Sequence, residues 1–348
     1  MSKDYTILCH PICYVCISSY RWHTRLFLAF MDIKVKNSFL LTILISIGFM
    51  IFLLMRVEWK QFSLIAGRLN VKDLIAAFTI FMFGNLIRAF RFNKLDHMDK
   101  RLTRWWNINA FYNFMTATLP GGAGEASTAY VLKRFAGLNF LGAIRILLLS
   151  RLMDLFALAA LFFISAILIS NITPYRETAI WLSGILFFVS SVAFLRSSEQ
   201  FLMRLLQKLP TKSEFIQRIS KKLSELTNIV EEQHSKKLFR VTLFQSILMM
   251  MGGIASVHLL LRSFGIDFTL VQSAYCYGIY MIFQIVPIQG IAGIGTQAAW
   301  WALALKASGY HSPDVIVLGI VLHGTFYVFI TIIGLSALLI LLMRRKAN

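Results

Sequence analysis

The chain of 348 residues is 57% hydrophobic and 15% charged, with a mean hydropathy of +0.68, values that exclude a soluble domain of this length. Several apolar stretches reach the roughly 20 residues that an α-helix needs to cross the bilayer, and the alternation of a membrane β-barrel is absent. The sequence therefore predicts an all-α polytopic membrane protein.

The formal charge of +19 comes from 35 Lys and Arg residues against 16 Asp and Glu residues. These basic residues gather in the loops beside the apolar stretches, where the positive-inside bias of membrane proteins places them. Membrane topology therefore explains the charge, and attraction to anionic lipid head groups adds to it. We predict no nucleic-acid partner.

Residues 1–37 form a basic leader that differs in composition from the rest of the chain. Met31 begins a short basic stretch directly before a clean apolar span, and we hypothesise that translation starts there. Cys9, Cys13 and Cys16 lack a fourth ligand at a familiar metal-site spacing. We predict no metal site and no cofactor.

Six apolar stretches are predicted to span the membrane, and two weaker apolar regions are interrupted near their middles. Region 105–136 is interrupted by Pro-Gly-Gly at 120–122, and region 269–307 by a glycine-rich sequence at 286–297. Each half of either region is too short to cross alone, which favours re-entrant pairs of broken helices. The six full spans are predicted at 38–56, 73–91, 141–170, 178–196, 239–262 and 313–343.

The order of these elements repeats along the chain. Residues 38–170 contain two spans, a broken pair and a third span, in that order. Residues 178–343 repeat this order. The basic loops place both termini in the cytoplasm, although the basic loop 56–72 then lies outside, against the rule. Because the halves start from opposite sides, we predict an inverted repeat with a substrate site near the membrane midplane. This transmembrane domain, 38–343, is followed by a basic tail at 344–348.

Residues 197–240 join the two halves and are amphipathic, because their apolar residues recur at three- and four-residue spacing. We predict that this segment lies at the cytoplasmic interface. It is either a solvated helical hairpin that links the halves or a surface that recognises lipid or a protein partner.

The first break lies in the sequence LPGGAGEASTAYVLKRF. Pro120 can end the incoming half-helix, and Gly121 and Gly124 let backbone approach a ligand or a neighbouring helix. Glu125 begins the outgoing half-helix, whose free N–H groups and positive dipole end suit a phosphate. The alternative is structural, with glycines for tight helix packing and Glu125 as an N-terminal charge.

The second break offers Pro287, Gly290, Gly293 and Gly295 among polar but uncharged neighbours. These residues either form a substrate site opposite the first break or provide small-residue packing between helices.

The span 141–170 contains three charged residues, Arg145, Arg151 and Asp154. Arg151 and Asp154 are three positions apart and share a helix face, so they can form an ion pair. Charges at such depth are costly and usually face a bundle interior or a watery cavity, which makes both residues candidates for substrate binding. A purely structural ion pair is the alternative. Arg145 is expected at the interface.

Arg88 and Arg91 end the second span at its cytoplasmic side, where we expect them to contact lipid phosphates or to snorkel. Lys133 and Arg134 are interpreted in the same way.

No nucleophile–base motif, nucleotide loop or carboxylate pair of the glycosidase type appears in the sequence, so we predict that the protein is not an enzyme. His258 and His323 lie within spans without a metal-ligand neighbour at helical spacing, which favours packed histidines over a proton relay.

Four stretches resemble, in order and spacing, the motifs of the lysylphosphatidylglycerol synthase transmembrane-region family, also called the flippase-like domain family. They are NLIRAFRFNKL, TLPGGAGEASTAYVLKRFAG, SRLMDLFALAALF and VPIQGIAGIGTQAAWWALAL, and the resemblance runs over residues 38–343. The residues that it places at family motif positions are Pro120, Gly124, Glu125, Arg134, Arg151 and Asp154.

In that family the domain forms the membrane half of the multiple peptide resistance factor, where it moves aminoacylated phosphatidylglycerol across the bilayer. Stand-alone members are linked to polyprenyl-phosphate sugars, hopanoids or other envelope lipids. The resemblance does not extend to a soluble aminoacyltransferase domain, so it does not imply lipid aminoacylation.

Our leading hypothesis is a bacterial-type inner-membrane protein that binds a lipid with an anionic or phosphate-bearing head group and moves it between leaflets. Arg151 and Arg134 would meet the phosphate, while Glu125 and Asp154 would poise those arginines or accept a cationic head group. The alternative is a non-transporting membrane partner of a glycosyltransferase or another envelope-lipid enzyme, which would dock through residues 197–240.

Overall fold

The computed structural model describes six stretches of the chain, 59–95, 101–120, 122–169, 176–195, 236–284 and 290–346. The leader, the predicted span 38–56 and most of the predicted amphipathic segment lie outside the described residues. The helices of the first half are α3 (Trp59–Gly67), α4 (Val71–Leu95), α5 (Leu102–Thr118), α6 (Gly122–Val131), η1 (Leu132–Ala136) and α7 (Phe140–Leu168). Those of the second half are α8 (Arg176–Leu195), α11 (Lys236–Ser263), α12 (Leu270–Phe283), η2 (Ile291–Gly293), α13 (Thr296–Ala307) and α14 (Val315–Lys346).

The all-α polytopic membrane fold predicted from the sequence is confirmed. Within α4, α7, α11 and α14 lie four segments that are long and apolar enough to cross a membrane. The predicted span 178–196 forms α8. Large apolar side chains cover the outside of the bundle, as lipid contact requires; examples are Trp181, Phe188, Phe244 and Leu168.

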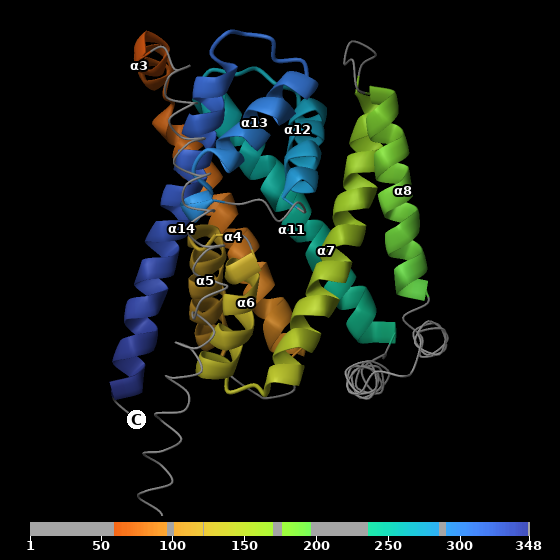
Figure 1. The fold of residues 1–348 in the computed structure, drawn as a ribbon, viewed down its shortest axis with the longest axis vertical. Helices are drawn as coiled ribbons and strands as arrows, with labels where there is room; N and C mark the ends of the chain where they lie inside the picture. Colours follow the sequence, from red (N-terminus) through yellow and green to blue (C-terminus); the bar gives the residue numbers. More distant parts are fainter. Residues whose placement is uncertain are drawn as a thin grey trace, which may run out of the picture.

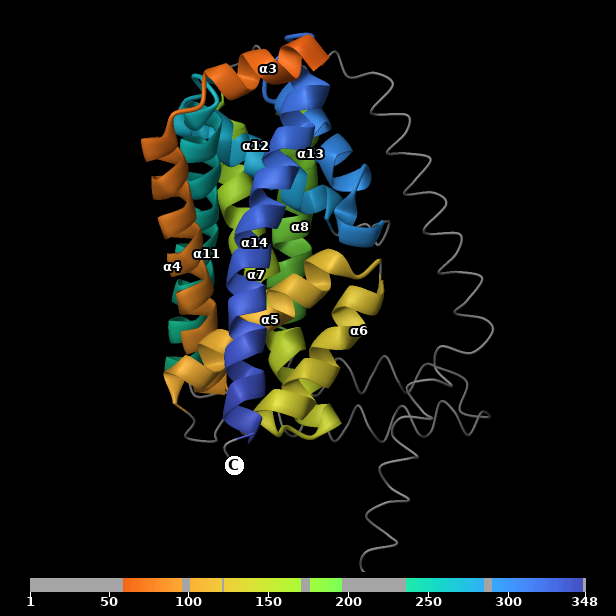
Figure 2. The same ribbon diagram turned by 90° about the vertical axis from the view of Figure 1, so that its left-hand side faces the viewer.

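The two interrupted regions fold as pairs of short helices. At a rise of about 1.5 Å per residue, even the longest of these four helices, α5 with 17 residues, falls short of the roughly 30 Å hydrocarbon core. Figure 2 shows α5 and α6 in the lower half of the molecule and α12 and α13 in the upper half. The two pairs therefore enter from opposite ends, as an inverted repeat predicts. They meet inside the bundle, where α5 contacts η2.

Each broken pair packs against both halves of the chain. The helix α5 packs on α4 of its own half and on α14 of the other, while α12 packs on α11 of its own half and on α7 of the other. The long helices α4 and α11 lie side by side along one flank of the molecule (Figures 1 and 2). This interlocking fixes the position of both breaks within the bundle.

Two glycines of α14 allow these close contacts. A Cβ on Gly319 would lie 2.4 Å from the carbonyl oxygen of Ala298 in α13, and one on Gly334 would lie 2.3 Å from Cβ of Phe114 in α5. Side chains at these positions would collide, so one glycine serves each broken pair.

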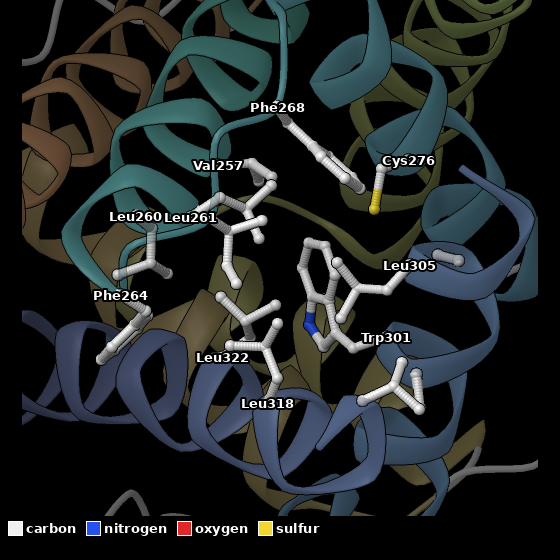
Figure 3. Close-up of a cluster of buried hydrophobic side chains, with 14 of the residues drawn as sticks. Val257, Leu260, Leu261, Phe264, Phe268, Cys276, Trp301, Leu305, Leu318 and Leu322 are labelled. Carbon is white, nitrogen blue, oxygen red and sulfur yellow. The ribbon is translucent and has the colours of Figure 1, made fainter. Parts of the chain in front are cut away.

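Each pair of short helices packs into an apolar core of its own. The upper core joins α11, α12, α13 and α14, with Trp301 only 1% exposed and in the middle of the leucines shown in Figure 3. The Trp301 ring stacks on Tyr280 at a centroid distance of 3.8 Å. The lower core gathers α4, α5, η1 and α7 around Trp105, which is fully buried. Between these two cores lies a cavity that both polar and apolar side chains line.

Candidate functional site

A cavity of about 560 Å³ lies inside the bundle, a volume within the usual range of small-molecule sites. Side chains from α4, α5, α7, α11, α12, α13 and α14 line it, so both broken pairs and the long helices contribute. Its polar and charged lining residues are Asn85, Arg88, Tyr112, Asn113, Thr116, Arg151, Asp154, Tyr277, Tyr280, Gln284, Gln297, His323 and Tyr327.

The part of the lining that comes from the first half of the chain is positively charged. We call Arg88, Tyr112, Asn113 and Arg151 the cationic wall. Nη1 of Arg88 donates a hydrogen bond to Oδ1 of Asn113 at 2.7 Å, and Nη2 of Arg151 donates to the Tyr112 hydroxyl at 3.0 Å. Both of these bonds join a guanidinium group on one helix to a neutral side chain of α5.

Asp154 also lines the cavity, and its partner is Arg91. Nη2 of Arg91 donates to Oδ2 of Asp154 at 3.0 Å, and Nη1 contacts both Oδ1 of Asp154 and the Ser246 hydroxyl, the latter at 2.6 Å. Arg91 is 1% exposed. Burial removes the water that would otherwise solvate this bidentate pair. Each charge is therefore stabilised mainly by its partner, and the loss of one would leave the other buried without a counter-charge.

This arrangement corrects two sequence-based expectations. Arg91 was expected at the membrane interface, but the packing of α4 along α11 turns it into the bundle. An ion pair between Arg151 and Asp154 was one of two alternatives, yet Arg151 bonds to Tyr112 on α5 while Asp154 bonds to Arg91 on α4. Spacing on one helix makes a pair geometrically feasible, but neighbouring helices decide which partner each side chain meets.

Arg88 also departs from its expected interfacial position. It is partly buried and lines the cavity, three residues before the buried Arg91 on α4. Its partner Asn113 belongs to an amide cluster in which Nδ2 of Asn109 donates to the backbone carbonyl of Asn85 at 3.2 Å. The asparagines inside these apolar helices were a signal for a polar interior that the sequence analysis missed.

The part of the lining that comes from the second half has no Lys, Arg, Asp or Glu among its described residues. We call Tyr277, Tyr280, Gln284, Gln297, His323 and Tyr327 the uncharged wall. Oε1 of Gln297 accepts hydrogen bonds from the Tyr280 hydroxyl, at 2.9 Å, and from Nε2 of Gln284. The Tyr327 hydroxyl lies 3.2 Å from the Thr118 hydroxyl of α5, so this wall reaches the first broken pair.

The glycines of the second break shape the turn that carries this wall. Gly293 and Gly295 have φ of 63° and 84°, in the left-handed region that glycine tolerates best. Ala292, in η2, also has a positive φ, of 54°. Nε2–H of His323 donates to the Ala292 carbonyl at 2.9 Å. Gly290 closes the same turn, because its carbonyl accepts from the amide of Gly293. Pro287 lies outside the described residues.

The first break is built for close packing. Pro120 is buried between α5 and α6, and a Cβ on Gly124 would lie 2.8 Å from the carbonyl oxygen of Thr116. Gly124 therefore lets α6 pack against α5. Gly121 and the side chain of Glu125 lie outside the part of the chain that the structure describes.

Two further residues singled out in the sequence, Arg134 and His258, are absent from the described lining of the cavity. Arg134 is exposed on η1 and is absent from the described lining, and the side chain of Arg145 is outside the described part. His258 packs beside the Ser273 hydroxyl at 3.1 Å, away from the cavity. Within the described ranges, no three His, Cys, Asp or Glu side chains gather as metal ligands would, and the absence of a metal stays a prediction.

Comparison with known proteins gives one match. The sequence model of the family described as Lysylphosphatidylglycerol synthase TM region matches residues 39–334. Searches of the curated proteins and of the solved structures found no match.

Proposed function

Because the chain belongs to the lysylphosphatidylglycerol synthase TM region family, we propose that it binds a lipid with a phosphate-bearing head group in the central cavity and moves that lipid between leaflets. It acts as a transporter rather than as an enzyme. Its place is the cytoplasmic membrane of a bacterial-type cell, with both termini in the cytoplasm.

One observation carries this proposal. Two guanidinium groups, of Arg88 and Arg151, line a cavity inside membrane helices, and the one carboxylate in the described lining is already paired with Arg91. Among the described lining residues, the guanidinium groups therefore outnumber the carboxylates. Guanidinium groups bind phosphate oxygens through charge-assisted hydrogen bonds.

The broken helices support movement as well as binding. A phosphate crossing hydrocarbon alone would lose its hydration, whereas donors inside the cavity replace that water. Discontinuous helices that meet near the middle of a bundle from opposite ends are the arrangement in which substrate sites of alternating-access transporters lie. The head group would pass through the cavity while the acyl chains stay in the bilayer.

The charge distribution supports the proposed orientation. Arg101 directly precedes α5, Arg104 lies in its first turn and Lys133 lies on η1, and all three are exposed. The start of α5 and the end of α6 lie at the same end of the molecule as the C-terminus (Figure 2). At the opposite end, Arg262 is paired with Asp73, which reduces the net positive charge there. The positive-inside bias then assigns the end with the C-terminus to the cytoplasm.

The test is a transport assay in liposomes that contain the full chain and a fluorescent phosphatidylglycerol. We expect Arg88→Gln and Arg151→Gln each to slow its movement about tenfold, since each removes one charge-assisted contact with phosphate. Lys133→Gln is the matched control, because it removes one exposed positive charge outside the cavity. Equal rates in all variants, or no transport above empty liposomes, would overturn the proposal and favour the scaffold alternative.

A further inference from the structure

Phenylalanine rings fill the space between two long helices beside the cavity, α4 and α14. Both helices pack closely on α5, and in addition α4 packs on α11 and α14 packs on α13. The backbones of α4 and α14, in contrast, come near each other at few points. We call Phe78 and Phe81 of α4, together with Phe326 and Phe329 of α14, the aromatic seam.

The rings of the aromatic seam contact one another across the two helices. The ring centroid of Phe78 lies 4.8 Å from that of Phe329. The centroid of Phe81 lies 6.0 Å from that of Phe326 and 5.9 Å from that of Phe329. Phe78 and Phe81 pack against both apolar cores, so the seam lies where the two cores meet. Among the described residues, no hydrogen bond or ion pair joins α4 to α14.

We infer that the aromatic seam is the lateral opening through which a lipid reaches the cavity from the bilayer. The head group enters the cavity, and the acyl chains pass between α4 and α14 into the surrounding hydrocarbon. This inference rests on the proposed function, because it assumes that a lipid phosphate occupies the cavity. It adds which two helices part to admit the lipid.

The first argument is that the seam separates the cavity from the lipid. Phe81 and Phe326 line the cavity on the inner side of the seam. Met82 directly follows Phe81 and Val328 directly precedes Phe329, and both Met82 and Val328 are exposed on the outside of the bundle. The rings therefore lie between the cavity and the hydrocarbon that surrounds the protein.

The second argument is the order of residues along α4. Phe81, Gly84 and Arg88 all line the cavity, and their spacings of three and four residues place them on one face of the helix. At about 1.5 Å per residue, Arg88 lies about 10 Å along the axis from Phe81. A Cβ added to Gly84 would meet nothing within 4 Å, so there is open space beside the helix between the seam and the guanidinium group. A lipid whose phosphate binds Arg88 therefore has room for its acyl chains to leave at the seam.

The third argument is the low cost of parting these two helices. Between α4 and α11, Nη1 of Arg91 donates to the Ser246 hydroxyl at 2.6 Å, and the Ser256 hydroxyl donates to the Ala77 carbonyl at 3.0 Å. Parting α4 from α11 would leave these donors unpaired in hydrocarbon. Parting the seam would instead expose rings to acyl chains, which are as apolar as the rings themselves.

The first test closes the seam with a covalent link. Phe81→Cys and Phe326→Cys are introduced together into the full chain after its four native cysteines are replaced by alanine, and a short bis-methanethiosulfonate joins the two thiols. We expect the movement of fluorescent phosphatidylglycerol in liposomes to fall to the level of empty liposomes. It should return when a reductant cleaves the link, which shows that the fold is retained.

A matched control places the same link elsewhere in the bundle. Phe156 on α7 and Phe187 on α8 have ring centroids 5.0 Å apart, and both residues lie outside the described lining of the cavity. Linking Phe156→Cys to Phe187→Cys in the same background should leave the rate of lipid movement unchanged.

The second test detects acyl chains in the seam. With p-benzoylphenylalanine in place of Phe81, illumination should attach phosphatidylglycerol to α4, which mass spectrometry detects as an increase in peptide mass. This capture should fall about tenfold in Arg88→Gln, because the lipid loses one charge-assisted contact with its phosphate. As a control, the same photoreactive residue in place of the lipid-facing Phe188 should capture lipid equally with and without Arg88→Gln.

The outcomes separate this inference from the proposed function. Transport that continues through the linked seam but slows in Arg88→Gln would leave the phosphate site standing and overturn the seam as its entrance. Equal loss of transport in both linked pairs would assign the block to general stiffening and overturn the seam as well. Capture of residues 38–56 from position 81, in place of lipid, would mean that this predicted span covers the seam and would also overturn it. No transport by the unlinked chain above empty liposomes would overturn both proposals.

Discussion

The two broken pairs, α5 with α6 and α12 with α13, perform the same structural task with different chemistry. Each packs on a long helix of its own half and on a long helix of the other, and each relies on one glycine of α14. Yet the first half surrounds the cavity with arginine and asparagine, whereas the second half presents tyrosine and glutamine. Backbone packing constrains both pairs alike, while side chains that face the cavity are free to differ.

The two sides of the cavity therefore differ in charge, with the arginines on the side of the first half. Under the proposed function, the lipid phosphate would lie toward α4 and α7, which carry Arg88 and Arg151. The following variants test how separate the structural and the chemical contributions of the two halves are.

The largest effect is expected from breaking the buried ion pair of the first half. Asp154→Asn leaves the guanidinium of Arg91, 1% exposed, without a counter-charge. We expect the free energy of unfolding, measured by detergent titration in mixed micelles, to fall by about 3–5 kcal/mol.

The control for this loss replaces both partners. The double variant Arg91→Leu with Asp154→Leu removes both charges together, so it should recover much of the stability that Asp154→Asn loses. An unfolding free energy unchanged in Asp154→Asn would contradict the assignment of this pair as a buried, mutually dependent unit.

A smaller effect is expected at the contacts of α14 with the broken pairs. Gly319→Ala places a Cβ 2.4 Å from the Ala298 carbonyl oxygen, and Gly334→Ala places one 2.3 Å from Cβ of Phe114. Each should lower the free energy of unfolding by about 1–3 kcal/mol, the usual cost of overpacking.

The same helix supplies the matched control for that prediction. Gly324 has nothing within 4 Å of an added Cβ, so Gly324→Ala should leave stability unchanged or raise it slightly. If Gly319→Ala and Gly334→Ala differed strongly from each other, the two broken pairs would not be structurally equivalent.

The smallest effect is expected at the ion pair of the opposite end. Nη2 of Arg262 lies 3.0 Å from Oδ1 of Asp73, but the Arg262 side chain is 52% exposed. Arg262→Gln should therefore lower the free energy of unfolding by only about 0–1 kcal/mol, because water screens the pair and replaces its hydrogen bonds. A loss as large as that of Asp154→Asn would mean that burial does not distinguish the two pairs.

The sequence analysis located the breaks better than the site. Pro120 and the glycines of 286–297 interrupt apolar stretches, and these local signals predicted both broken pairs. The order of the spans and the basic loops predicted that the pairs run in opposite directions. The same analysis did not identify Asn113, Tyr277 or Tyr280, because single polar residues in apolar helices carry no local sign of where they point.

The sequence by itself determined that this chain is an all-α membrane protein with long helices and two interruptions, since hydropathy and helix-breaking residues act over one helix at a time. Only the tertiary structure decided that Asp154 pairs with Arg91, 63 positions away, instead of with Arg151 on the same helix. It also decided that Arg88 faces the cavity. These choices depend on how α4, α5, α7 and α11 are rotated against one another, and that rotation results from packing between segments far apart in the chain.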